Sequence, residues 1–312
     1  MNPVYLALES GACLLFIGAA WAARRRGRLP FLELVSAAMF GVLLEEGDQL
    51  IFETYHYSPD WILAIDRAPI VIGLTWALII AGAMRLTDAL GVRRRYAPVV
   101  DSVLAISLDL AFDAIAIRMG LWTRRDIGPA DGWFGVPAGN FYAWLFVTVG
   151  FSLVTRWLRD AAARRSALEW LQLLVPLPAF GLLLAGLIPF VIIQPLVEPA
   201  PGGGLAVFAI TLVAFCAVAA WAVWGPDRGV PNGQRTAILD LRLAFASRLA
   251  VHLVFLAALL HMRLYAELPV LLVVALALLA AEVPLAALVH ARLRTDEATA
   301  SVSRASLAEA PD

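Results

Sequence analysis

The chain contains no lysine, so all of its basic side chains other than histidine are arginines. Schiff-base chemistry requires a lysine amine and is therefore excluded. The chain has two cysteines, Cys13 and Cys216, and both fall in apolar runs, which predicts neither a disulfide framework nor a thiolate metal site. No nucleotide-binding loop, zinc-ligand spacing, solenoid repeat or soluble domain is recognisable. These absences point away from a soluble enzyme, a metal site and a nucleic-acid partner.

The chain is instead rich in apolar residues. It is 61% hydrophobic, with a mean hydropathy of +0.79, and its apolar residues fall in runs of roughly 20, the length that spans a bilayer core. This pattern predicts an all-α fold, a polytopic integral membrane helix bundle with about nine transmembrane helices. The predicted spans lie near residues 4–22, 31–51, 67–84, 98–119, 137–156, 168–195, 204–224, 245–263 and 268–290.

Arginine-rich segments alternate along the chain and predict its orientation. By the positive-inside rule these segments lie in the cytoplasm. The chain is then expected in the plasma membrane, with its N-terminus outside the cell and its C-terminus in the cytoplasm. The acidic segment 45–66 then falls outside. Arg118, Arg124 and Arg125 are the exception, since they follow the fourth span on the predicted outer side. We expect residues 1–294 to form the transmembrane domain and residues 295–312, rich in Ala, Ser and Glu, to form a disordered cytoplasmic tail.

Two aspartates, Asp109 and Asp113, lie in the middle of the fourth predicted span. Carboxylates at this depth are costly, so they normally face the bundle interior or a wet cavity and mark a functional site. Their four-residue spacing places both side chains on one helical face. Because two like charges so close cannot easily both ionise, at least one should keep its proton near neutral pH. The pair therefore predicts a buried acid.

Other polar and aromatic residues fall at the same predicted depth. The second span ends in Glu45 and Glu46, and the segment after the fourth contains Trp122, Trp133, Asn140 and Tyr142. A cavity lined in this way would suit acid chemistry on an apolar substrate. A desolvated acid can protonate a carbon–carbon double bond, aromatic faces can stabilise the resulting carbocation, and water can then add to it.

Structural interpretations of the same residues stay open. The aspartates could pair with Arg118 or Arg85 to hold helices together, and the two glutamates could be solvated loop residues. His252 and His261 have no obvious acidic partner, which favours a structural role. An interfacial aromatic belt is a further interpretation of the segment that contains Tyr55, His56, Tyr57 and Trp61.

Two sequence stretches carry a family resemblance. Residues 108–122, LDLAFDAIAIRMGLW, and 133–144, WFGVPAGNFYAW, resemble the membrane carotenoid biosynthesis proteins, which include the carotenoid 1,2-hydratases acting on gamma-carotene and on bisanhydrobacterioruberin. Those proteins similarly pair a D-x-x-x-D helix with a G-x-W loop and an F-G-[IV]-P-x-x-N-[FY] entry to the next helix. Three upstream features of the family also have counterparts here. The acid corresponds to Glu45 or Glu46, the Y-x-Y pair to Tyr55 and Tyr57, and the Pro–Trp segment to Pro69 and Trp76. The resemblance covers roughly residues 40–150.

The chain departs from the family pattern at three places. Ala114 stands where members commonly have proline, Trp122-Thr123-Arg124 replaces W-x-W, and Phe52-Glu53 replaces F-G. These changes leave the acid pair intact and affect loop residues that would contact the substrate.

The resemblance implies a cofactor-independent hydratase of the lyase class. One of Asp109 and Asp113 would protonate a terminal alkene, Glu45 or Glu46 would handle the water, and Asn140 would position it. No cofactor and no metal is expected, and the partners would be membrane lipids and a lipophilic polyene or isoprenoid substrate. The substrate-binding side chains would be those of Tyr55, Tyr57, Trp76, Trp122, Trp133, Asn140, Tyr142 and Trp144.

Three other functions remain open. A carotenoid or terpene cyclase would use the same proton donor. A membrane prenyltransferase would use aspartates to bind magnesium diphosphate. A proton-coupled transporter or a structural membrane protein would use the carboxylates as a proton relay or as helix contacts.

Overall fold

The computed structural model describes residues 2–125, 127–200, 202–225 and 238–308, the last fourteen of them by their backbone only. Within these ranges, nine helices have 20 or more residues: α1 (Pro3–Arg26), α2 (Arg28–Gly47), α3 (Ile70–Ala89), α4 (Ala97–Arg118), α5 (Ala138–Arg164), α6 (Pro176–Val197), α7 (Leu205–Trp224), α8 (Ile238–His261) and α10 (Pro269–Ala308). The shorter elements are a π-helical turn (Asp48–Phe52), a 3-10 helix (Ser166–Leu174), α9 (Leu264–Glu267) and the strands β1 (Tyr55–Tyr57), β2 (Ala64–Ile65), β3 (Ala68–Pro69) and β4 (Trp122–Arg124).

The predicted all-α membrane bundle is confirmed. Seven of the described long helices are apolar and long enough to cross a membrane, which makes the chain an integral membrane protein. The other two, α2 and α4, have the length but carry four charged residues each, and these include the predicted acids. The predicted sixth span divides at Val175, where the 3-10 helix ends and α6 begins.

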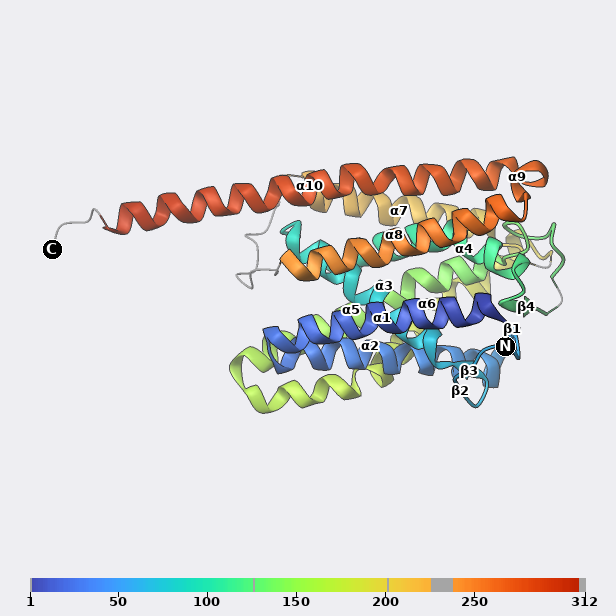
Figure 1. The fold of residues 1–312 in the computed structure, drawn as a ribbon, viewed down its shortest axis with the longest axis horizontal. Coiled ribbons are helices and arrows are strands. Elements are labelled where there is room, and N and C mark those ends of the chain that lie inside the picture. Colours follow the sequence, from blue (N-terminus) through green and yellow to red (C-terminus); the bar gives the residue numbers. More distant parts are fainter. Residues whose placement is uncertain (1, 126, 201, 226–237, 309–312) are drawn as a thin grey trace.

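Figure 1 shows the long helices running side by side, with the N-terminus and the four short strands at one end of the bundle. At the opposite end α10 projects beyond the other helices (Figure 1). This helix continues to Ala308, past the predicted domain boundary at 294, while residues 309–312 and the arginine-containing segment 226–237 lie outside the described residues. The disorder expected for the tail stays a prediction.

Burial places α3 and α5 at the centre of the bundle. In each of them 67% of the apolar window is buried, against 11–28% in the other five candidate spans. Outward faces carry large aliphatic side chains such as Leu196, Ile210 and Val283, as expected of surfaces that contact lipid. α4, which is not among these seven spans, is also buried over most of its length. The protein core therefore lies around α3, α4 and α5, and the peripheral helices separate it from the bilayer.

Two glycines set the distance between α2 and α3. A Cβ atom on Gly41 would lie 2.6 Å from the Cβ of Trp76, and one on Gly73 would lie 2.5 Å from a Val42 methyl group. Because neither position has room for a side chain, the two backbones approach closely, as small residues allow in membrane helices. This contact places Trp76 beside the C-terminal half of α2.

The other end of the bundle is cross-linked by buried ion pairs. Asp101 is fully buried, and its carboxylate lies 3.0 Å from the Arg156 guanidinium. Arg159 binds Glu33 at 2.8 Å and Asp88 at 2.9 Å. These pairs connect α2, α3, α4 and α5. Breaking one of them is costly because the remaining partner would be a buried charge without a counter-charge.

Candidate functional site

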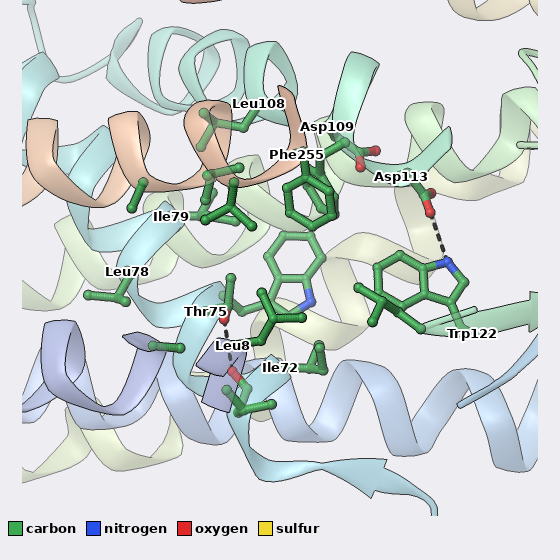
Figure 2. Close-up of a pocket in the computed structure, with 18 of the residues that line it drawn as sticks. Leu8, Ile72, Thr75, Leu78, Ile79, Leu108, Asp109, Asp113, Trp122 and Phe255 are labelled. Carbon is green, nitrogen blue, oxygen red and sulfur yellow. Dashed lines mark hydrogen bonds between the residues drawn. The ribbon is translucent and has the colours of Figure 1, made fainter. Parts of the chain in front are cut away.

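A cavity of about 230 Å³ lies at the strand-bearing end of the bundle, among α1, α2, α3, α4, α5 and α8. Most of its wall is apolar, and four of its polar side chains converge from three helices: Glu45 from α2, Asp109 and Asp113 from α4, and Asn140 from α5. Figure 2 shows Asp109, Asp113 and Trp122 at one end of this space and Leu78 at the other. We call it the acid cavity.

A two-stranded antiparallel sheet supplies four of the residues that line the acid cavity. β1 pairs with β4 in a register that sets Tyr55 opposite Arg124 and Tyr57 opposite Trp122. Side chains alternate between the two faces of a strand, so these four residues share one face while His56 and Thr123 on the other are exposed. The alternation of side chains along the two strands therefore directs all four of these residues toward the cavity.

Glu45 is surrounded by hydrogen-bond donors. Both Tyr55 and Tyr57 donate their hydroxyls to its Oε2 atom, and the Trp76 indole donates to Oε1 at 2.6 Å. Burial raises the pKa of both tyrosines well above the ordinary value, and the Glu45 carboxylate raises it further. The phenols therefore stay protonated as donors, and the carboxylate is held in place without a positive charge.

Asp113 is held differently, by a cation. Its carboxylate accepts hydrogen bonds from the Trp122 indole at 2.9 Å, from Arg124 at 2.6 Å and from the Asn140 amide at 2.8 Å. Burial alone would lower the pKa of Arg124, but Asp113, Tyr55 and Asp109 together more than offset it, and the net pKa lies above the ordinary value. Asp113 therefore has three donors, and the charged one, Arg124, balances the charge of its carboxylate.

Asp109 has far fewer partners. Its side chain is fully buried, and its Oδ2 atom accepts one hydrogen bond from Asn140 at 3.2 Å. Oδ1 is buried and has no hydrogen-bond partner among the described residues, and neither has the Nε atom of Arg124. Buried polar atoms without a partner are rare and need an explanation. Since both residues line the acid cavity, a ligand or water there would be within reach of them.

Aromatic rings form much of the remaining wall. Trp76 and Trp144 lie with their ring centroids 4.1 Å apart, and Phe112 contacts Trp144 at 5.7 Å and Phe255 at 5.0 Å. The rings come from α3, α4, α5 and α8, so the cavity is closed on several sides by faces that can interact with a cation.

The structure brings most of the predicted site residues together, but it places three elsewhere. Glu46 accepts the backbone N–H groups of Arg67 and Ala68, which fixes the loop before α3. Trp133 donates its indole N–H to the Leu110 carbonyl at 2.9 Å, and Tyr142 packs against Phe146 and Phe190. None of these three lines the acid cavity.

The three outer arginines that disagreed with the predicted orientation each have a local partner. Arg118 donates to the carbonyls of Ala114 and Phe134 at 2.8 Å, and it makes no ion pair with the aspartates. Arg125 pairs with Glu53 at 2.6 Å, and Arg124 with Asp113. Arg85, the other partner proposed for the aspartates, binds Glu33 instead.

Sequence reasoning missed two features of the site. In the sequence Arg124 stands out as an exception to the arginine alternation and as a departure from the family pattern, but neither signal places it beside Asp113, where it forms a buried ion pair. The sequence indicates no acidic partner for His252, yet its Nε2 atom lies 3.2 Å from Glu282, which also binds Arg248 at 2.6 Å. This buried triad joins α8 to α10, and Arg248 lines the acid cavity.

Within the described part of the chain, no group of three or more His, Cys, Asp or Glu side chains is placed to hold a metal ion. In a comparison with protein families, the model described as "Carotenoid biosynthesis protein" matches residues 2–213. This range extends beyond the 40–150 region of the sequence resemblance, and it contains every cavity-lining element except α8. No curated protein and no solved structure matches the chain significantly.

Proposed function

The chain belongs to the carotenoid biosynthesis protein family, and we propose that it adds water to a terminal C=C bond of a carotenoid or related isoprenoid by acid catalysis within the membrane. The observation that carries this proposal is the unequal environment of two carboxyl groups in one apolar cavity. Asp113 is saturated with donors, whereas Asp109 has a buried oxygen without a partner.

In the proposed reaction Asp109 is the general acid. A buried carboxyl group with a single neutral donor is more stable protonated than ionised, especially beside a second carboxylate. Arg124 neutralises Asp113 and so leaves the proton on Asp109. The O–H bond of Asp109 breaks as its proton forms a C–H bond at the less substituted carbon of the alkene, and the positive charge develops on the tertiary carbon.

The walls of the acid cavity would then stabilise the carbocation. The indoles of Trp76, Trp122 and Trp144 and the Phe112 ring line the space in front of the aspartates, and aromatic faces attract a cation through their quadrupoles. The negative charges of the Asp113 and Glu45 carboxylates would also attract the carbocation, and the low dielectric of the site strengthens this attraction.

Water completes the reaction. Asn140, which contacts both aspartates, would position a water molecule whose oxygen forms the new C–O bond. The proton lost by that water passes to the Glu45 carboxylate and returns to Asp109 before the next turnover. The net change is addition of one water to the alkene, with every protein group restored.

The surroundings of the aspartates favour hydration over its alternatives. A prenyltransferase needs aspartates that bind a magnesium diphosphate, and the guanidinium of Arg124 beside Asp113 opposes a divalent cation there. A cyclase would share the acid but needs no water, whereas Asn140 and Glu45 offer polar atoms to one.

The product formed in a carotenoid-producing host tests the proposal. We expect a polar product heavier by one water in extracts of cells that express the protein. Glu45→Gln should lower its yield by a factor of about 10² or more, as expected for loss of a general base. Glu46→Gln is the matched control, because this neighbouring glutamate binds a loop and its replacement should leave the yield at the wild-type level. An isomeric product would favour the cyclase, and unchanged carotenoids would contradict the proposal.

A further inference from the structure

A second, smaller cavity adjoins the acid cavity. It has a volume of about 40 Å³ and is bounded by α1, α2, α3 and α8. Leu78 of α3 and Ser247 of α8 line both spaces, so these two side chains lie between neighbouring cavities. We call the second space the inner cavity, because it extends toward the end of the bundle from which α10 projects.

Together the two cavities follow a groove between α1, α3 and α8. On α8 their walls run from Phe255 to Asp240, and on α1 from Ala7 to Arg26. With a rise of 1.5 Å per residue these stretches measure roughly 22 and 28 Å. The groove therefore approaches the thickness of a bilayer hydrocarbon core, about 30 Å.

The chemistry of the groove changes along its length. Its middle is apolar and lined by small residues: Ala19 on α1, Gly82 on α3 and Ala244 on α8. A Cβ atom on Gly82 would lie 3.6 Å from the Cβ of Ala244, an ordinary van der Waals distance, so a side chain longer than that of alanine at this position would meet α8. The inner end is charged, with the Arg26–Asp240 pair and Arg85 in its wall.

The acid cavity also reaches the outer surface of the bundle. Ala7 and Gly11 of α1 and Val254 of α8 line it and are exposed, and a Cβ atom on Gly11 would meet no atom within 4 Å. An apolar molecule in the bilayer can therefore approach between α1 and α8 without crossing water.

We propose that this groove binds the whole length of a linear, membrane-spanning isoprenoid, with the reacting alkene in the acid cavity and the distal end beside Arg26 and Asp240. The inference rests on the proposed function, since it takes the acid cavity as the reacting end. Small residues at Ala19, Gly82 and Ala244 leave room for an extended chain, and the charged inner end fits a hydroxyl or another polar terminus. The groove then selects substrates by length.

Filling the inner cavity tests the proposal. Gly82→Leu and Ala19→Leu obstruct it from opposite walls, and Ala246→Leu adds the same bulk at an exposed position of α8 at a similar depth. The purified full-length protein is given a linear tetraterpene or a monoterpene with the same terminal alkene. For each obstructing variant that remains folded, the ratio of tetraterpene to monoterpene turnover should fall by about tenfold or more, since pocket contacts discriminate on this scale. Ala246→Leu should keep the wild-type ratio.

A binding measurement separates this inference from the proposed reaction. The tetraterpene that co-purifies with each protein is quantified, which requires no turnover. Less bound tetraterpene in Gly82→Leu and Ala19→Leu than in Ala246→Leu supports the groove even if wild-type protein hydrates neither substrate, an outcome that would overturn only the proposed function. An unchanged turnover ratio and unchanged binding in the folded variants would overturn the groove, as would a phospholipid that co-purifies in place of the polyene.

Discussion

Arg124 donates a hydrogen bond from its Nη2 atom to Asp113 at 2.6 Å, and both side chains are only 4% exposed. The pair connects the β1–β4 sheet to α4. It also distinguishes the two aspartates, since one is neutralised by a cation and the other is not. The difference in their proposed roles follows from this contact.

Removing the guanidinium should destabilise the fold. Arg124→Gln leaves the buried Asp113 carboxylate without its cation, which costs about 3–5 kcal/mol of unfolding free energy. Arg125→Gln is the matched control, because the Arg125–Glu53 pair is 53% and 44% exposed and exposed pairs contribute only about 0–1 kcal/mol. Denaturant unfolding in detergent measures both.

The double variant Arg124→Gln/Asp113→Asn checks the cause. Removing the carboxylate as well should recover much of the lost stability, since no buried charge then stands alone. If Arg124→Gln unfolds as readily as Arg125→Gln, or if the double variant shows no recovery, the ion pair does not have the assigned role.

The two cavity tyrosines predict a dependence of stability on alkaline pH. Their pKa is raised well above 10.0 by burial and by Glu45, so between the unfolded and folded pKa values the folded state binds more protons than the unfolded state. Stability contributed by the protonated phenols is complete below about pH 10 and is lost as the pH rises above it. Thermal unfolding is measured between about pH 8 and 12, a range around the ordinary tyrosine pKa of about 10. The unfolding temperature should decline more steeply with pH for wild type than for Tyr55→Phe/Tyr57→Phe. Parallel curves would contradict the assignment.

Much of the fold could be predicted from the sequence because apolar length and helical period are local properties. The Asp109–Asp113 spacing fixed a shared helical face, and depth alone suggested that Glu45 and Asn140 would lie near it. Arg124 could not be placed in this way, since its position depends on a register between strands more than sixty residues apart. The same limit hid the His252–Glu282 contact, which joins two helices whose relative rotation no local pattern specifies. Depth likewise could not separate Glu45 from Glu46, because adjacent residues on α2 differ by about 100° in direction.

The orientation of the bundle remains a prediction that labelling can test. The positive-inside rule places the Arg93–Arg95 loop in the cytoplasm and the 45–66 segment outside. After replacement of Cys13 and Cys216, a cysteine at exposed Asp60 should react with an impermeant reagent in intact cells, and one at exposed Arg94 should react only after permeabilisation. The reverse pattern would invert the predicted topology.

The most direct measurement is turnover of a polyene with a terminal alkene by purified protein in D₂O, comparing wild type with Asp109→Asn. An amide retains the shape of the carboxyl group but cannot donate an acidic proton, so turnover should fall by a factor of about 10² to 10⁴ while the variant remains folded. The wild-type product should contain one added water and one carbon-bound deuterium on the carbon next to the new carbinol. A folded Asp109→Asn protein with wild-type turnover, or a hydrated product without that deuterium, would contradict the account.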